Sequence, residues 1–226
     1  MSVGHQTQWQ LEAVSLSTAG LHDAWPKLQA GQRLCRIVQP TDRALVLGSS
    51  TRQSEFDLDR ARRQGLAVVR RNSGGGAVLV EPGAQIWLML YLGLDDPLVP
   101  WDLGRSFLWL GAAVLGLLRE LRLNATMVES RQPRTALGSL ICFADLGYGE
   151  VSVDGAKVLG LAQRRSRGQA CFQLSLLWDE RQSHLRELLV VDPSEGESLR
   201  VAGIAPLVDL SRQDVQNRVV KAITAL

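Results

Sequence analysis

The sequence Arg70-Arg71-Asn72-Ser73-Gly74-Gly75-Gly76-Ala77-Val78 decides how the rest of the chain is interpreted. Consecutive glycines let backbone N–H groups approach a ligand without interference from Cβ atoms, and they permit positive φ angles. The run directly follows Leu66-Ala67-Val68-Val69, which is typical of a buried strand. Glycines alone would fit a tight turn or bulge equally well. The phosphate loop of nucleotide hydrolases and the dinucleotide-binding fingerprint need other glycine spacings, so both classes are excluded.

The composition indicates an ordinary globular chain. It has 226 residues, 46% of them hydrophobic, which is enough to bury a substantial core. The 25 basic and 23 acidic residues give a formal net charge of +2, so charge gives no reason to expect nucleic acid or a membrane as partner. There is no long apolar stretch and no pattern of a secretory signal, so we expect a cytoplasmic protein. We expect a single domain over residues 1–226.

Hydrophobic periodicity predicts a mixed α/β fold. The expected helices cover residues 21–31, 55–64, 103–121 and 212–226. The expected strands cover residues 33–38, 44–48, 66–69, 77–80, 85–92, 150–153, 157–162 and 169–177. The first two strands would flank a turn, and two β-hairpins are expected, one through Glu81-Pro82-Gly83-Ala84 and one through Asp154-Gly155, a dipeptide that favours tight turns. Trp101 and Trp109, assigned to the long helix, are expected in the core.

A second motif lies downstream in Asp154-Gly155-Ala156-Lys157-Val158-Leu159-Gly160-Leu161-Ala162-Gln163-Arg164-Arg165. With the glycine run, it resembles the lipoate–protein ligase and octanoyltransferase family over roughly residues 46–178. The resemblance implies the α/β fold of class II biotin and lipoate ligases, with a mixed, mainly antiparallel sheet, flanking helices and an acyl tunnel between the glycine run and the lysine strand. The acyl or substrate-binding residues that it implies are Arg71, Ser73, Gly74, Gly75, Gly76, Ala77, Val78, Gly160, Ala162 and Gln163.

Lys157 attracts attention because lysine is scarce in this chain. Only Lys27, Lys157 and Lys221 are lysine, and the other basic residues are arginine. A compact ammonium can act as a point charge beside a carbonyl oxygen, phosphate or thiolate where a planar guanidinium would be too large. The alternative is a solvated lysine on a hairpin.

Cys142 lies fifteen residues before Lys157 and is followed by Phe143. A nearby lysine cation favours the thiolate, which is the nucleophilic form. The order of Cys142, Phe143, Glu150, Gly155 and Lys157 resembles the cysteine-dependent octanoyltransferases. In that reaction the cysteine takes octanoyl from a carrier protein's pantetheine thioester and passes it to a lysine of a lipoyl domain, without a metal or cofactor. The alternative for Cys142 is a small buried hydrophobic residue.

Three alternatives in function stay open at this point. The segment 162–168, followed by Gln173-Leu174-Ser175-Leu176, resembles amidotransferases that move octanoyl from the glycine-cleavage H-type protein to lipoyl domains. ATP-dependent ligases, which would need ATP and Mg, commonly carry His-Asp after the glycine run and His-Gly after the lysine motif, where this chain has Val80-Glu81 and Leu174-Ser175. A non-catalytic relative that binds lipoyl domains would keep the pocket with an idle thiol. The oxyanion contact would come from backbone N–H groups around the glycine run or from Lys157, and the sequence does not separate these two.

The remaining cysteines and histidines receive no role. Cys35 and Cys171 fall within strand-like segments and are expected in the core. His5, His22 and His184 show no spacing to a chemical partner.

Overall fold

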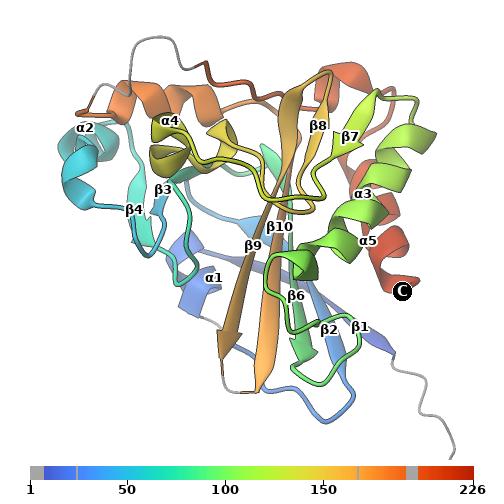
Figure 1. The fold of residues 1–226 in the computed structure, drawn as a ribbon. Helices are drawn as coiled ribbons and strands as arrows, with labels where there is room; N and C mark the ends of the chain where they lie inside the picture. Colours follow the sequence, from blue (N-terminus) through green and yellow to red (C-terminus); the bar gives the residue numbers. More distant parts are fainter. Residues whose placement is uncertain (1–7, 24, 167, 192–197) are drawn as a thin grey trace, which may run out of the picture.

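A seven-stranded sheet forms the centre of the molecule (Figure 1). The computed structural model describes residues 8–23, 25–166, 168–191 and 198–226. In spatial order the strands are β1 (Trp9–Leu16), β2 (Arg33–Pro40), β6 (Gln85–Gly93), β10 (Gln169–Leu177), β9 (Ala156–Ser166), β8 (Val151–Val153) and β7 (Ala125–Met127). Only the β1–β2 pair is parallel, so the sheet is mixed but mainly antiparallel, as predicted.

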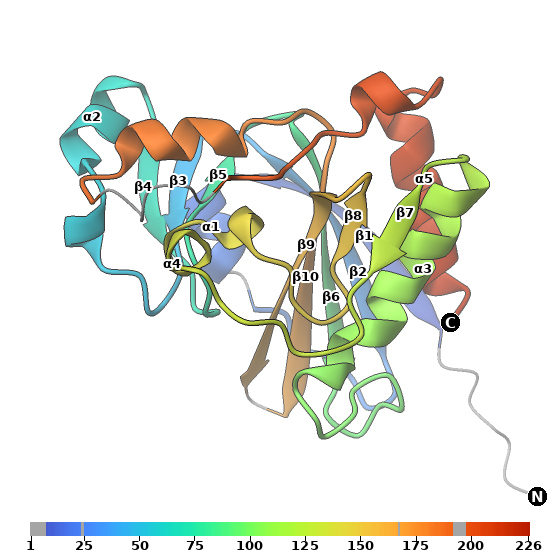
Figure 2. The same ribbon diagram turned by 45° about the horizontal axis from the view of Figure 1, so that its top comes forward.

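A second sheet of three short strands lies beside the first, on the side away from α3 and α5 (Figure 2). Its order is β4 (Ala67–Arg70), β3 (Ala44–Leu47) and β5 (Val78–Val80), and β3 is parallel to β4 but antiparallel to β5. The glycine run connects β4 to β5. The small sheet therefore places the run at the boundary between the two sheets.

The helices cover the outside of the sheets. The two long helices, α3 (Leu108–Glu120) and α5 (Arg212–Thr224), pack on each other against one face of the large sheet (Figure 1). Shorter helices are α1 (Thr18–Asp23), α2 (Leu58–Arg63) and α4 (Ala136–Leu140). Single 3-10 turns or short 3-10 helices cover Gln53–Glu55, Arg105–Phe107, Cys142–Ala144, Gln182–Leu188 and Ala205–Leu207.

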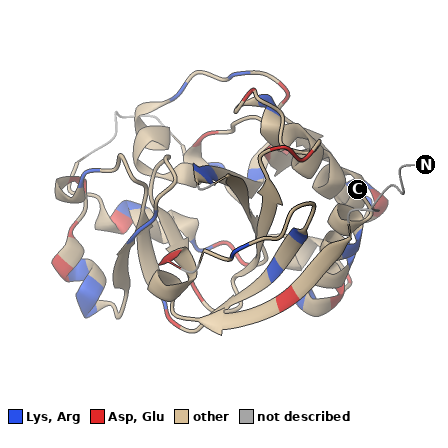
Figure 3. Cartoon of the chain, turned by 90° about the horizontal axis from the view of Figure 1, so that it is seen from below, with Lys and Arg blue, Asp and Glu red and all other residues tan. Residues whose placement is uncertain are grey.

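The central strand β6 is buried on both faces, and because side chains alternate along a strand, its successive residues enter two different cores. On β6, Ile86 and Leu88 face the core under α3 and α5, whereas Trp87 and Met89 belong to the core shared with the small sheet. This second face carries the candidate site. Basic and acidic residues are interspersed along the described chain (Figure 3). Within the described ranges, no helix is long and apolar enough to span a membrane.

The hairpin between β8 and β9 is confirmed. Asp154 and Gly155 both adopt positive φ angles, of 50° and 78°, which is the backbone that an Asp-Gly turn requires. Lys157 therefore lies at the start of the return strand, as predicted. The helix stop at Gly65 is also confirmed, with φ of 76°, although α2 begins at Leu58 because the Asp57 side chain accepts a hydrogen bond from Arg60 N.

The predicted hairpin between residues 77–80 and 85–92 is wrong. Residues 77–80 and 85–92 do form strands, but β5 pairs with β3 in the small sheet and β6 pairs with β2 and β10 in the large one. The turn at Pro82-Gly83 therefore carries the chain from one sheet to the other. The strands β2 and β3 flank a turn, as predicted, and each joins a different sheet. Strand pairing is non-local, so local alternation does not reveal it.

Other differences concern the helices and the N-terminal strand. The expected helix over 21–31 is wrong, because α1 covers Thr18–Asp23 and no helix is present over 25–31. The start of α1 is held by Asp42, which accepts hydrogen bonds from the Thr18 N–H and hydroxyl, both at 2.7 Å. The expected helix over 103–121 is α only from Leu108 to Glu120. Trp101 precedes it and is 94% exposed, which corrects its core assignment, whereas Trp109 packs on Phe172. Strand β1 was not expected, because it is a mostly exposed edge strand without apolar alternation.

Candidate active site

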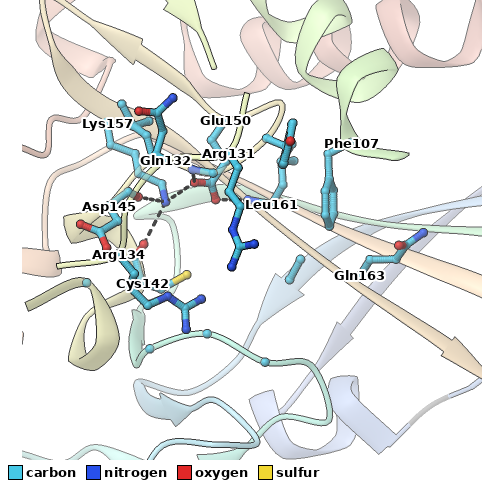
Figure 4. A pocket seen from close by; sticks show the side chains of 18 of the residues that line it. Phe107, Arg131, Gln132, Arg134, Cys142, Asp145, Glu150, Lys157, Leu161 and Gln163 are labelled. Carbon is cyan, nitrogen blue, oxygen red and sulfur yellow. Dashed lines mark hydrogen bonds and ion pairs between the residues drawn. The ribbon is translucent and has the colours of Figure 1, made fainter. Parts of the chain in front are cut away.

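Lys157 is buried, with a side chain only 2% exposed, so the solvated alternative is wrong. Its Nζ donates three hydrogen bonds: to the Cys142 carbonyl oxygen at 2.8 Å, to the Asp145 carbonyl oxygen at 2.6 Å and to Glu150 Oε2 at 2.6 Å (Figure 4). An ammonium has three protons, so all of them are in use. We expected this cation to act on the thiol; among the described contacts it instead binds the backbone of Cys142.

Glu150 compensates the charge of Lys157 inside the protein. Besides Lys157, its Oε2 accepts from Gly147 N at 2.6 Å and its Oε1 accepts from Leu161 N at 3.0 Å. The residue is 6% exposed. A buried ion pair is tolerated when additional hydrogen bonds satisfy both partners. The pair therefore ties the segment that follows Cys142 to strand β9.

Cys142 is half-buried and begins a short 3-10 helix (Cys142–Ala144). Its N–H donates to the Ala77 carbonyl oxygen at 2.9 Å, and Ala77 N donates to the Leu140 carbonyl oxygen at 2.6 Å. The thiol-bearing residue is thus held on one side by the end of the glycine run and on the other by Lys157. A Cβ on Gly76 would lie 2.8 Å from Cys142 N and 2.6 Å from Leu140 O, so only glycine allows this approach.

Arg71 shapes the glycine run from inside. Its Nη2 donates to the carbonyl oxygens of Gly74 and Gly76, at 2.9 and 2.8 Å, and the residue is 4% exposed. Gly75, between them, has φ of 97°, and a Cβ there would lie 3.6 Å from Cys142 Sγ. The run therefore passes directly beside the thiol. The N–H groups of residues 74–76 have no acceptor among the described residues.

A cavity of about 420 Å³ opens over Cys142 and Lys157. It is lined by residues 73–76, 131–134, 145–148 and 161–163, together with Phe107, Gly138, Cys142, Glu150 and Lys157. Five of the lining residues are charged: Arg131, Arg134, Asp145, Glu150 and Lys157. Most of the predicted substrate-binding residues meet here, namely Ser73, Gly74, Gly75, Gly76, Ala162 and Gln163.

A second, narrow cavity of about 50 Å³ lies between the two sheets. Its apolar lining residues are Val46, Val78, Val80, Trp87, Phe143 and Leu161. Gly160 and Arg71 also line it, and a Cβ on Gly160 would lie 2.7 Å from the Phe143 ring. Cys142, Leu161 and Ala162 line both cavities. The thiol therefore lies where a large, charged cavity meets a narrow, mainly apolar one, in the place where an acyl tunnel was expected.

Ala77 is the one predicted substrate-binding residue that lines neither cavity. It is fully buried, and its backbone bonds to Leu140 and Cys142 give it a local structural role. Gln163 lines the large cavity, and its Oε1 accepts a hydrogen bond from Ser106 at 3.0 Å.

The two other cysteines lie in the core, whereas one histidine lines the narrow cavity. Cys35 and Cys171 are buried in the core, as predicted, and burial raises the pKa of both thiols to about 12. His22 lines the narrow cavity, which the sequence did not indicate. Burial, helped by the nearby Arg71 and opposed by Asp23, lowers the pKa of His22 to about 4. His184 lies outside both cavities, and His5 lies outside the described residues.

Three further residues of the large cavity were missed as site residues. Glu150 belonged to the motif but received no role, although a carboxylate is the expected partner for a buried lysine. Arg131 and Arg134 gave no signal, because arginine is by far the commonest basic residue of this chain. In the described part of the chain, no group of three or more His, Cys, Asp or Glu side chains could hold a metal ion.

The sequence matches the family described as "Lipoyl protein ligase A/B catalytic domain" over residues 9–224. The chain belongs to this family. Among curated proteins it is similar to "Octanoyltransferase LipM" of Brevibacillus brevis, with 30% identity over 130 residues that cover 55% of this chain and 46% of that protein. The LipM of Moorella thermoacetica is 31% identical over 117 residues, which cover 51% and 42% of the two chains. The chain spans less than half the length of these relatives.

Solved structures share the fold. One, described as lipoate-protein ligase A bound with ATP, superposes with a TM-score of 0.75 at 20% identity, covering 96% of this chain and 85% of that chain. Another, a putative lipoate protein ligase from T. acidophilum with bound lipoic acid, gives 0.74 with the same coverage and identity. The predicted lipoate ligase fold, a mainly antiparallel sheet with flanking helices, is therefore confirmed.

Proposed function

We propose that this protein transfers an octanoyl or lipoyl group to a lysine of lipoyl domains through a thioester on Cys142. One observation carries the proposal: Cys142 lies at the junction of the two cavities, with its backbone held by the glycine run and by Lys157. A nucleophile at such a junction can meet an acyl chain from one side and its carrier from the other. The similarity to proteins named octanoyltransferase supports the same reaction.

The narrow cavity suits the acyl chain. Val46, Val78 and Val80 come from the small sheet, and Trp87 and Leu161 from the large one. A hydrocarbon chain gains free energy when it leaves water for such a lining. On β9, Gly160 leaves room for the Phe143 ring that lines this cavity, and Ala162 adds only a methyl group to the lining. Arg71 supports the proposal indirectly, by holding the carbonyl groups of the run.

The proposed reaction consists of two acyl transfers. Cys142 Sγ attacks the carbonyl carbon of an octanoyl pantetheine thioester, the new thioester forms, and the pantetheine thiol leaves with the proton. The lysine amine of the acceptor then attacks the Cys142 thioester, an amide forms, and the Cys142 thiol is restored. The oxyanion of each step requires hydrogen-bond donors. Because all three Lys157 protons are already donated, the N–H groups of Gly74, Gly75 and Gly76 are the better candidates.

The proposed partners follow from this reaction. The donor is an octanoyl or lipoyl carrier protein, and the acceptor is a lipoyl domain or an H-type protein of the glycine-cleavage system. One solved relative is described as a bi-partite lipoate protein ligase from Thermoplasma acidophilum with its E2 lipoyl domain, which supports a lipoyl-domain acceptor. No cofactor takes part in either transfer. A reducing compartment keeps a free thiol such as Cys142 reduced, so we propose that the protein works in the cytoplasm.

The test is intact-mass analysis after incubation with octanoyl carrier protein in the absence of ATP. The wild-type protein should gain the mass of one octanoyl group, and the Cys142→Ala variant should gain none. Cys171→Ala is the matched control, because it removes a buried cysteine outside the proposed reaction and should still gain the adduct. Activity that depends on ATP, Mg and free octanoate or lipoate, with no adduct, would favour the ligase reaction instead. Binding of lipoyl domains without modification would favour the non-catalytic alternative.

A further inference from the structure

Two arginines extend into the large cavity from an exposed segment, residues 129–135, that precedes α4 (Figure 4). Arg131 and Arg134 both line this cavity together with Cys142 and Lys157. Neither has a hydrogen-bond or ion-pair partner among the described residues. Two unpaired guanidinium groups at one cavity indicate a ligand that carries negative charge.

The acidic side chains of the same cavity are already occupied. Glu150 is bonded to Lys157, Gly147 N and Leu161 N. The Asp145 carboxylate accepts from the Thr135 N–H and hydroxyl, both at 2.8 Å, at the start of α4. Neither carboxylate therefore pairs with the arginines. The remaining uncompensated charge of the cavity is positive.

The glycine run and the residue before it supply further donors to the same cavity. Ser73 is only 6% exposed, lines the cavity, and its Oγ has no hydrogen-bond partner in the described structure. A buried hydroxyl without a partner is uncommon and calls for one. The next three residues, 74–76, line the same cavity, and their backbone N–H groups have no acceptor among the described residues. Unpaired donors from two separate segments thus line one cavity, which suits a group rich in acceptor oxygens.

We propose that Arg131 and Arg134, together with Ser73, bind the phosphate of a phosphopantetheine arm that carries the acyl thioester. The inference rests on the proposed function and specifies its donor. In such an arm the thioester and the phosphate lie at opposite ends, so a thioester at half-buried Cys142 requires phosphate contacts further out, where residues 129–135 are exposed. A guanidinium group can donate two parallel hydrogen bonds to two oxygens of one phosphate. A donor that holds octanoyl as a lysine amide has no phosphate and makes no use of this site.

The experiment compares two donors that differ only in the phosphate, octanoyl-pantetheine and octanoyl-4′-phosphopantetheine. The rate of octanoyl addition to Cys142 is measured by intact mass at donor concentrations below saturation. We expect the phosphorylated donor to react about tenfold faster with the wild-type protein, since hydrogen bonds to charged groups contribute on this order. In the double variant Arg131→Gln/Arg134→Gln the ratio of the two rates should fall to near one. Added salt should lower the wild-type ratio as well.

The matched control is Arg63→Gln/Arg218→Gln, which removes the same charge from exposed positions that line neither site cavity. It should keep the wild-type ratio. Equal rates for both donors in the wild-type protein, or an equal fall of the ratio in both double variants, would overturn the phosphate site alone. Failure of both donors to acylate Cys142 would instead overturn the proposed function, and the phosphate site with it.

Discussion

The two sides of the large cavity differ in how completely their polar groups are satisfied. On the β9 side, the three Lys157 protons and both Glu150 oxygens are bonded within the protein. On the other side, Arg131, Arg134 and Ser73 have no partner among the described residues. A satisfied network fixes positions, whereas unsatisfied donors are available to a ligand. The comparison separates the groups that hold Cys142 in place from those that can bind the donor.

Replacing Lys157 should have the largest effect on the satisfied side. Lys157→Met leaves Glu150 buried without its countercharge, and we expect the free energy of unfolding to fall by about 3 to 5 kcal/mol. Acylation of Cys142 should fall by at least about 100-fold, on the scale of losing one group that organises an active site. Lys157→Arg should also acylate slowly, because a planar guanidinium cannot donate to the same three acceptors in the geometry of an ammonium. Chemical denaturation and intact-mass kinetics measure the two effects.

A double variant separates charge burial from positioning. Lys157→Met/Glu150→Gln removes both charges while the amide can still accept from Leu161 N, so part of the lost stability should return. Acylation should stay low, because Cys142 and Asp145 have still lost the ammonium that held their carbonyl groups. If acylation returns together with stability, Lys157 has no role beyond compensating Glu150.

A smaller effect on the free energy of unfolding is expected at low pH, from His22 in the narrow cavity. Burial and the nearby Arg71 lower the pKa of His22 to about 4, below the value of about 6.5 for an unfolded chain. The unfolded state thus binds the proton first, so His22 contributes stability above about pH 6.5 that is lost as the pH falls towards 4. The loss should be at most about 3 kcal/mol. Denaturation of His22→Gln between pH 7 and 4 should show a flatter profile than the wild type, and His184→Gln should not.

The sequence predicts one side of the site far better than the other. Cys142 and Lys157 were found through a motif, and the turn at Asp154-Gly155 carries its own local signal, so the hairpin that presents Lys157 could be predicted. Arg131 and Arg134 could not, because in a chain whose basic residues are mostly arginine neither type nor spacing distinguishes them. Their role depends on which carboxylates lie nearby and are already bonded. Only the folded arrangement reveals that.

The fold shows the same division between local and non-local information. The strands β5 and β6 could be predicted from their apolar residues, but their separation into two sheets could not, because pairing partners lie far apart in the sequence. That separation matters for function, since the narrow cavity lies between the two sheets. An acyl tunnel was expected from family resemblance, and the narrow cavity that we propose for the acyl chain depends on a strand pairing that the sequence predicted wrongly.

The smallest expected effect tests whether the open side carries little of the stability. Ser73→Ala removes a buried hydroxyl that has no partner, so the free energy of unfolding should change by no more than about 0.5 kcal/mol, or rise slightly. Ser106→Ala is the matched control: Ser106 is fully buried and its hydroxyl donates to the Leu103 carbonyl oxygen at 2.7 Å. That variant should lose about 1 kcal/mol, because it removes a hydrogen bond made by a fully buried hydroxyl. Urea denaturation compares the two, and equal losses would mean that the two sides of the cavity do not differ in the way that their hydrogen bonds indicate.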